Sequence, residues 1–267
     1  MRWLIYFGIL AILTSCKKEF HNLNTVVLGH AGESLLKSRS KYPPDTFKSA
    51  ERAINLGATG VEIDVQMTAD SILVAYHDPE LSENSDGSGC INSLNYNEIK
   101  NFKVYKSDQT IDLLSDFLDI TIKKGKELFL DVKHANACTN TIIDYQTFNN
   151  TLNTILIGYT NAEKNLITIN CRDYHLLEAV TDTTLNLAYE YDDVSIALPI
   201  VLANGYDKLT IKLEALDQTM VDVIKNAGVS FGIYNMKTRS EVYEALEYAP
   251  DFVISDNIEC TLKALNE

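Results

Sequence analysis

The fold is decided by residues 59–78, which read TGVEIDVQMTADSILVAYHD. Apolar and polar residues alternate through VEIDVQ, and this period of two predicts a strand with Glu62 and Asp64 on the same face. Two carboxylates so close raise each other's pKa unless a cation lies between them, and a hard divalent ion suits oxygen ligands. The chain then turns and enters a second apolar run that ends at His77. One strand–turn–strand unit can therefore bring two carboxylates and a histidine to one place.

The same stretch also has a plainer interpretation. Alternating acids on a strand usually form its solvated face, and an isolated histidine is usually a surface residue or one satisfied by its neighbours. For residues 59–78 alone this interpretation is slightly favoured, so the rest of the chain has to decide between a site and a surface.

Strands and helices alternate on both sides of this stretch. Strands are predicted at residues 25–29, 60–65, 128–133, 166–170, 185–191, 208–213, 229–234 and 252–255. Helices are predicted at residues 43–56, 111–124, 140–159, 173–181, 195–204, 216–227, 240–248 and 258–265. Eight strand–helix units predict a (β/α)₈ TIM barrel, an α/β fold, as a single domain over residues 25–267. Residues 78–110 are rich in Ser, Asn, Asp and Gly, and they are predicted to be a short insertion after the second strand.

The barrel gives the polar residues a common place. Active sites of these barrels lie at the C-terminal ends of the strands. Polar residues with catalytic or ligand chemistry end the first three predicted strands or the hairpin beyond the second: His30, Glu62, Asp64, His77, Asp131 and Lys133. Such convergence is not expected of independent solvated residues. It favours a catalytic metal site over the solvated-face interpretation.

The N-terminus carries a targeting pattern. Residues 1–15 contain one charge, Arg2, and an apolar run that is too short to span a bilayer, which is typical of a signal peptide. The run ends in Leu-Thr-Ser before Cys16, which resembles a bacterial lipobox and implies cleavage there and lipidation of Cys16. Residues 16–24 then form a tether. We expect an exported lipoprotein of the cell envelope, on the periplasmic or the outer surface; an ordinary signal peptide cut nearby is the alternative.

Charge and cysteine content limit the partners. The formal net charge of −14 argues against nucleic acid, and it leaves the lipid at Cys16 as the expected membrane contact. The other four cysteines have no CxxC or Cys–His metal spacing. An exported chain can oxidise them, and Cys90 and Cys138 are both expected on the catalytic face. We predict that these two are joined, although several pairings remain open.

Several motifs resemble the glycerophosphodiester phosphodiesterase family along the whole mature chain. The family has His-Arg-Gly after strand one, Pro-Glu-Asn-Thr at a helix start, Glu-x-Asp-Val-x-x-Thr-x-Asp followed by His-Asp, Glu-x-Lys on strand three, and a closing Asp-x-Ile-x-Thr-Asp. The corresponding residues here are His30-Ala31-Gly32, Pro43-Pro44-Asp45-Thr46, 62–70, His77-Asp78, Asp131-Val132-Lys133 and 251–256.

This resemblance implies a barrel enzyme with one divalent cation, Ca²⁺ or Mg²⁺. The reaction implied is hydrolysis of glycerophosphodiesters, small molecules derived from deacylated phospholipids, to an alcohol and glycerol 3-phosphate. The matching positions make Glu62, Asp64 and Asp131 the metal ligands. They also make His30 and His77 the acid/base pair and assign the substrate phosphate to Lys133.

The sequence departs from the family pattern around the expected phosphate site. Ala31 replaces an Arg, Pro44 replaces a Glu, and Glu83 stands near a frequent Arg. Tyr234 replaces a Trp, and Asp131 is one methylene shorter than the family Glu. Two alternatives therefore stay open: a non-catalytic ligand-binding lipoprotein on a decayed barrel, and a lysophospholipase D-like relative.

Overall fold

The computed structural model describes residues 20, 23–36 and 38–266. The predicted signal peptide at residues 1–15 and the predicted lipidation site at Cys16 lie outside the described residues. Within the described part, no helix combines the length and the apolarity that crossing a bilayer requires.

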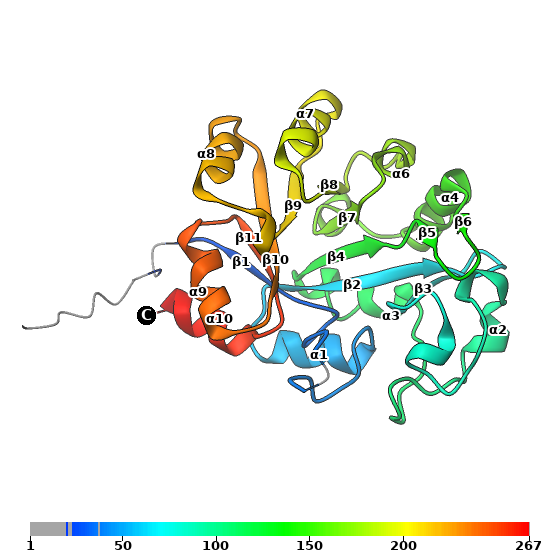
Figure 1. The fold of residues 1–267 in the computed structure, drawn as a ribbon. Coiled ribbons are helices and arrows are strands. Elements are labelled where there is room, and N and C mark those ends of the chain that lie inside the picture. The colour runs from blue at the N-terminus through cyan, green and yellow to red at the C-terminus, as the bar shows by residue number, and fades with distance from the viewer. Residues whose placement is uncertain (1–19, 21–22, 37, 267) are drawn as a thin grey trace, which may run out of the picture.

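The predicted TIM barrel is confirmed (Figure 1). Its parallel strands are β1 (Val26–Gly29), β2 (Gly60–Met67), β4 (Glu127–Val132), β7 (Ile167–Cys171), β8 (Asn186–Glu190), β9 (Lys208–Lys212), β10 (Ser230–Met236) and β11 (Phe252–Ser255). They neighbour one another in chain order, and β1 pairs with both β11 and β2, which closes the sheet into a barrel.

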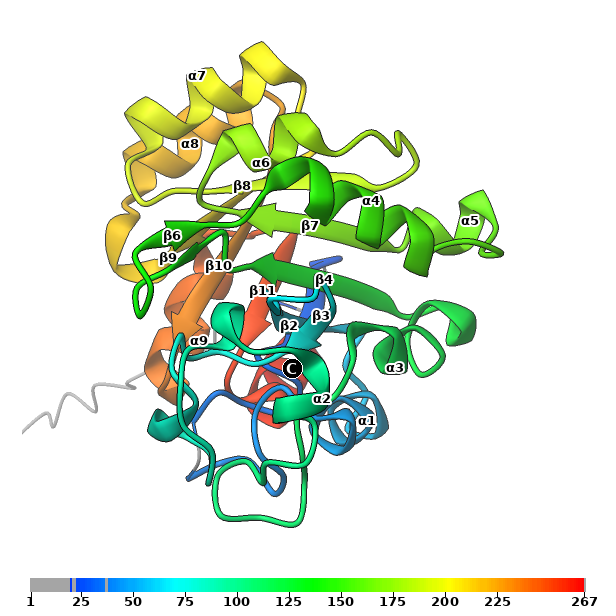
Figure 2. The same cartoon turned by 90° about the vertical axis from the view of Figure 1, so that its right-hand side faces the viewer.

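Helices surround the strands in both ribbon views (Figures 1 and 2). They are α1 (Phe47–Asn55), α3 (Leu114–Leu118), α4 (Tyr145–Ile155), α5 (Asn161–Lys164), α6 (Tyr174–Ala179), α7 (Val194–Asn204), α8 (Gln218–Asn226), α9 (Arg239–Glu247) and α10 (Ile258–Asn266). Their apolar faces pack on the outer face of the sheet and form the main core. A second, smaller cluster of Leu28, Phe129, Ala188, Phe252 and Ile254 fills part of the barrel interior.

The acidic residues of strand β2 face the interior of the barrel and not the solvent. All eight of its residues are buried. Val61, Ile63 and Val65 belong to the core between sheet and helices. The alternate residues point inside the barrel, where the side chains of Glu62 and Asp64 are each only 2% exposed. The alternation of apolar and polar residues therefore separates a helix-facing side from a lumen-facing side, and the plainer interpretation is wrong here.

The predicted insertion follows β2 and its hairpin partner, strand β3 (Leu73–Ala75), which pairs antiparallel with β2. It contains the short helices η1 (Leu81–Glu83), η2 (Ile91–Ser93) and α2 (Tyr96–Ile99), and it has its own small core. A disulfide between Cys90 and Cys138 ties it to the segment after β4, as predicted, with 5.7 Å between the Cα atoms. Cys171 and Cys260 are free.

Two predicted helices were too long. The helix predicted at 140–159 starts too early, because Thr141–Ile142 form strand β6, which pairs with β5 (Ala135–Asn136). Helix α4 begins only after Asp144, whose carboxylate caps it by accepting from the Thr147 N–H. The helix predicted at 111–124 is broken into α3 and the 3₁₀ turn η3 (Ile122–Lys124), where Ile-Thr-Ile, a run of stiff β-branched residues, follows α3.

Candidate active site

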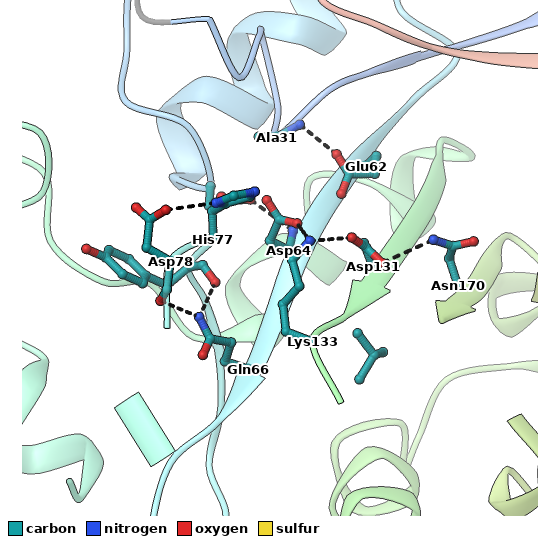
Figure 3. A network of polar contacts seen from close by, with 12 residues as sticks. Ala31, Glu62, Asp64, Gln66, His77, Asp78, Asp131, Lys133 and Asn170 are labelled. Atoms are coloured by element: carbon teal, nitrogen blue, oxygen red, sulfur yellow. Dashed lines mark hydrogen bonds and ion pairs between the residues drawn. The ribbon is translucent and has the colours of Figure 1, made fainter. Parts of the chain in front are cut away.

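Three carboxylates meet at the C-terminal mouth of the barrel. Glu62 and Asp64 come from β2 and Asp131 comes from the neighbouring β4, where Asp64 and Asp131 are direct register partners. One oxygen from each can be chosen so that all three lie within 4.8 Å of one another. Figure 3 shows the three side chains converging, together with Lys133 and His77. The structure therefore brings together the three residues that the sequence assigned to a metal.

This arrangement fits a hard divalent cation. The Asp64 Oδ2 atom is buried and has no hydrogen-bond partner among the described residues, so it is left with an unmet need for positive charge. Burial, and then the charge of Asp64, hold the pKa of Glu62 well above its usual range. Three clustered carboxylates are the donor set that Ca²⁺ or Mg²⁺ prefers. Glu62, Asp64 and Asp131 would hold such an ion.

Lys133 adds a fixed positive charge to this cluster. Its Nζ lies 2.6 Å from Asp64 Oδ1 and 2.5 Å from Asp131 Oδ2. Burial disfavours the ionised form of Asp64, but the Lys133 charge, with those of the histidines, outweighs it and lowers the pKa of Asp64 to about 2. Lys133 itself stays protonated, since the two carboxylates outweigh its burial and raise its pKa. An ammonium at this position can contact a phosphate that enters the cluster.

His30 is oriented by a buried carboxylate. Its Nδ1 lies 3.1 Å from Asp256 Oδ2, while Asp256 Oδ1 accepts from the Ser34 hydroxyl and the Leu35 N–H. Burial alone would lower the pKa of His30. The hydrogen bond and charge of Asp256, with the charges of Glu62 and Asp64, reverse this and raise it from 6.5 to about 9. His30 is therefore an imidazolium near neutral pH, with Nε2 not bonded within the described residues.

His77 is held in a similar way at the end of the hairpin. Its Nδ1 lies 3.0 Å from Asp78 Oδ1, and the other oxygen of Asp78 accepts from the Asn84 amide. The Gln66 amide donates to the backbone carbonyls of Tyr76 and Asp78 at 2.8 and 2.7 Å, which fixes the hairpin end (Figure 3). The hydrogen bond that His77 donates to Asp78 is the main cause that raises the pKa of His77. His77 is more exposed than His30, with 38% against 15% of the side chain accessible.

The cluster opens into a pocket of about 270 Å³. His30, Glu62, Asp64, His77, Asp131 and Lys133 all line it, so the structure places all six predicted polar residues in one cavity. Sequence reasoning missed most of the opposite wall, which is made of Asn170, Arg172, Glu190, Lys212, Tyr234 and Asn235. These residues end or follow strands β7 to β10. Their position at strand ends was a usable signal, but no motif draws attention to them.

Asp45 and Ala31 lie beside the carboxylate cluster and form hydrogen bonds with its residues. Asp45 is buried with a φ of 55°, and its Oδ1 accepts from the Asp64 N–H at 2.9 Å. Burial, then the Asp64 charge, raise its pKa well above the usual range, which favours its neutral form. Ala31 is fully buried, and its N–H donates to Glu62 Oε2 at 2.8 Å. Because Ala31 is fully buried, the longer side chain of an arginine at position 31 would require the surrounding backbone to shift.

Comparisons with known proteins agree with this geometry. A model of the glycerophosphoryl diester phosphodiesterase family matches residues 38–260. A glycerophosphodiester phosphodiesterase of Caldanaerobacter subterraneus subsp. tengcongensis is 36% identical over 78 residues, 29% of this chain and 30% of the relative. One of Bacillus altitudinis is 29% identical over 107 residues, 38% of this chain and 42% of the relative. The chain thus spans less than half the length of these relatives.

Solved structures share the whole fold. The phosphodiesterase of Oleispira antarctica, solved with the product sn-glycerol-3-phosphate, superposes with a TM-score of 0.79 at 21% identity, over 91% of this chain and 97% of that one. A glycerophosphodiester phosphodiesterase of Parabacteroides distasonis gives a TM-score of 0.73 at 21% identity, over 91% and 97%. With the family model matching most of its length, this chain belongs to the glycerophosphoryl diester phosphodiesterase family.

Proposed function

We propose that the protein is a divalent-cation-dependent hydrolase of glycerophosphodiesters that releases an alcohol and glycerol 3-phosphate. One observation carries this proposal. Two histidines, each with Nδ1 held by its own carboxylate, line the same small pocket as the three clustered carboxylates. General acid and general base catalysis need such oriented groups within reach of one reacting centre.

The two histidines differ enough to be given separate roles. The raised pKa of His30 keeps it protonated at neutral pH, so it is assigned as the acid that gives its proton to the leaving alcohol oxygen. His77, more exposed and held by Asp78, is assigned as the base that takes the proton of the attacking hydroxyl. The attacking hydroxyl is one of the glycerol: its oxygen forms a P–O bond as the bond to the leaving alcohol breaks, and water then opens the cyclic phosphate by the reverse proton transfers to give glycerol 3-phosphate. Lys133 contacts the phosphate oxygens, and a bound Ca²⁺ or Mg²⁺ would neutralise charge on the phosphoryl group.

Names and ligands of relatives support the substrate class. The curated relatives bear the name glycerophosphodiester phosphodiesterase. The Oleispira antarctica phosphodiesterase was solved with sn-glycerol-3-phosphate, the product expected here. The pocket favours a polar substrate over that of the lysophospholipase D-like alternative, because Leu35 and Ile254 are its purely aliphatic lining residues.

The experiment is a screen of the purified chain against glycerol phosphate esters of several alcohols, with Ca²⁺, Mg²⁺ or EDTA. Release of glycerol 3-phosphate that requires a divalent ion is expected, and Asp64→Asn should abolish it. Lys124→Met, which changes an exposed residue before β4 at the far end of the barrel, is the matched control and should match the parent. Tight ester binding without turnover would instead favour the non-catalytic binding lipoprotein.

We also propose that the chain is exported and anchored to the cell envelope by lipid on Cys16. The pattern of residues 1–16 motivates this, and the Cys90–Cys138 disulfide supports an oxidising compartment. Expression in a bacterium fed labelled palmitate should label the parent and leave Cys16→Ala unlabelled. Label on both proteins, or on neither, would contradict the assignment.

A further inference from the structure

The wall of the pocket opposite the carboxylate cluster has chemistry that the proposed reaction does not use. Around the barrel, β9 is the fourth strand from β2 in either direction, so Lys212 at its end lies across the mouth from Glu62 and Asp64. Asn170 joins the two sides. Its Nδ2 lies 3.1 Å from Asp131 Oδ1 and 2.8 Å from Glu190 Oε2. A phosphate held at the cluster therefore has this wall beside it.

Arg172 is a preorganised donor on this wall. Its Nη2 atom lies 2.7 Å from Asp192 Oδ2 and its Nε atom lies 3.6 Å from Glu190 Oε1. Asp192 also accepts from the Tyr234 hydroxyl at 3.4 Å. Two carboxylates thus hold a planar group with five donors, and the guanidinium still lines the pocket. A donor fixed in advance loses little entropy when a ligand binds.

Lys212 adds a second cation to this wall, where its charge, after the hydrogen bond from Asn235, helps to lower the pKa of Glu214 against the effect of burial. It lines the pocket and is partly buried, yet it makes no ion pair with any residue in the described part of the chain. The nearby Glu214 carboxylate accepts from the Asn235 amide at 2.6 Å. Both oxygens of Glu190 are likewise directed to donors, Asn170 and Arg172. Lys212 is therefore a cation of this wall that makes no close ion pair within the described residues, and it lines the same pocket as Arg172.

We propose that Lys212 and Arg172 form an anion subsite that binds a carboxylate or phosphate carried by the alcohol part of the substrate. This rests on the proposed function and names its substrate class: glycerol phosphate esters of small anionic alcohols. Lys133 and His30, with a cation that the carboxylate cluster would hold, would already provide positive charge for the phosphodiester itself. A second anion is what an ammonium and a guanidinium in one pocket recognise through charge-assisted hydrogen bonds. A cationic alcohol such as ethanolamine cannot pair with either of these two cations.

The experiment uses four glycerol phosphate esters of two-carbon alcohols: glycolate, ethylene glycol monophosphate, ethylene glycol and ethanolamine. They differ in charge at nearly constant size, and the first two separate carboxylate from phosphate recognition. For the parent, kcat/KM should be about tenfold to a hundredfold higher for at least one anionic ester than for the neutral one, the range expected for a charged hydrogen bond. The ethanolamine ester should be the poorest.

Lys212→Met keeps the aliphatic stem and removes the charge, so the ratio of anionic to neutral kcat/KM should fall toward one. Lys124→Met removes a charge far from the mouth and should leave the ratio as in the parent. A parent with equal kcat/KM for all four esters, or a ratio that survives Lys212→Met, would overturn the subsite while leaving the proposed function intact.

If no ester is hydrolysed, the proposed function fails, and the subsite is then tested by calorimetric titration of the same esters with Ca²⁺ present. Tighter binding of an anionic ester that Lys212→Met abolishes supports the subsite, and equal binding overturns it.

Discussion

The Asp256→Asn variant tests the assignment of His30 as the catalytic acid without changing any residue of the carboxylate cluster. The Asp256 carboxylate is 2% exposed and contacts His30, Ser34 and the Leu35 N–H. An asparagine keeps the shape and can still hydrogen bond, but it removes the negative charge. The hydrogen bond and the charge of Asp256 are the largest causes that raise the pKa of His30, and burial opposes them. Without that charge, the pKa of His30 should fall well below 9.

The size of the effect follows from the pKa itself. A rise from 6.5 to about 9 corresponds to roughly 3 kcal/mol in favour of the imidazolium. Because the folded pKa is raised, the stabilisation is fully present below pH 6.5 and is lost as the pH rises through 9. The parent should therefore lose up to roughly 3 kcal/mol of its free energy of unfolding in this window through His30. Asp256→Asn should lose much less.

Two measurements check this reasoning in metal-free protein. Labelled histidine and NMR titration give the midpoint for His30, assigned among the five histidines with a His30→Gln variant. Urea unfolding at pH 6 to 10 gives the stability difference between parent and Asp256→Asn. The difference should shrink toward high pH. A His30 midpoint near 6.5 in the parent, or an unchanged midpoint in the variant, would refute the acid assignment and its electrostatic origin.

Other changes test the remaining parts of the site. Asp64→Ala should abolish calorimetric Ca²⁺ or Mg²⁺ binding, and unchanged affinity would remove it from the cluster. His77→Ala should cost roughly 10²–10⁴-fold in turnover with little change in Tm, since the side chain is partly exposed; parental turnover would reject the base assignment. Asp45→Asn should keep metal binding and should not lower stability at pH 7, because burial and the Asp64 charge disfavour a carboxylate at this position; a loss of stability would contradict this. Serine at both Cys90 and Cys138 should cost about 2–4 kcal/mol of unfolding free energy, and no loss would show that the disulfide is dispensable.

The barrel could be predicted because its strands and helices alternate with clear periods, and the alternation places strand ends at one mouth. The ambiguity lay in β2. A strand that faces a polar barrel lumen has the same period of two as a strand that faces water. The sequence pattern of β2 alone therefore could not distinguish these two cases, and only the closed barrel does. The predicted helix boundaries were wrong where a local interaction sets the end of a helix, as at Asp144, whose side chain caps the start of α4.

Long-range partners were harder to predict than the reactive residues. His30 was found from its place after a strand, but its partner Asp256 is 226 positions away. The pairing follows from barrel closure: Gly29 and Ser255 are register partners on β1 and β11, so the next residue on each strand lies side by side. The pocket wall opposite the carboxylate cluster was not predicted, because no motif contains its residues Arg172, Glu190 and Lys212.

The departures from the family pattern do not have the physical character of decay. A barrel without a ligand gains stability by losing buried charge, because burying an unpaired carboxylate costs free energy. This chain keeps Glu62 and Asp64 at 2% exposure and leaves Asp64 Oδ2 without a partner among the described residues. It lacks an arginine at position 31, where the side chain is fully buried, and has Arg172 and Lys212 on the opposite wall. Positive charge is thus present in the pocket without an arginine at position 31, which supports the proposed reaction over the non-catalytic alternative.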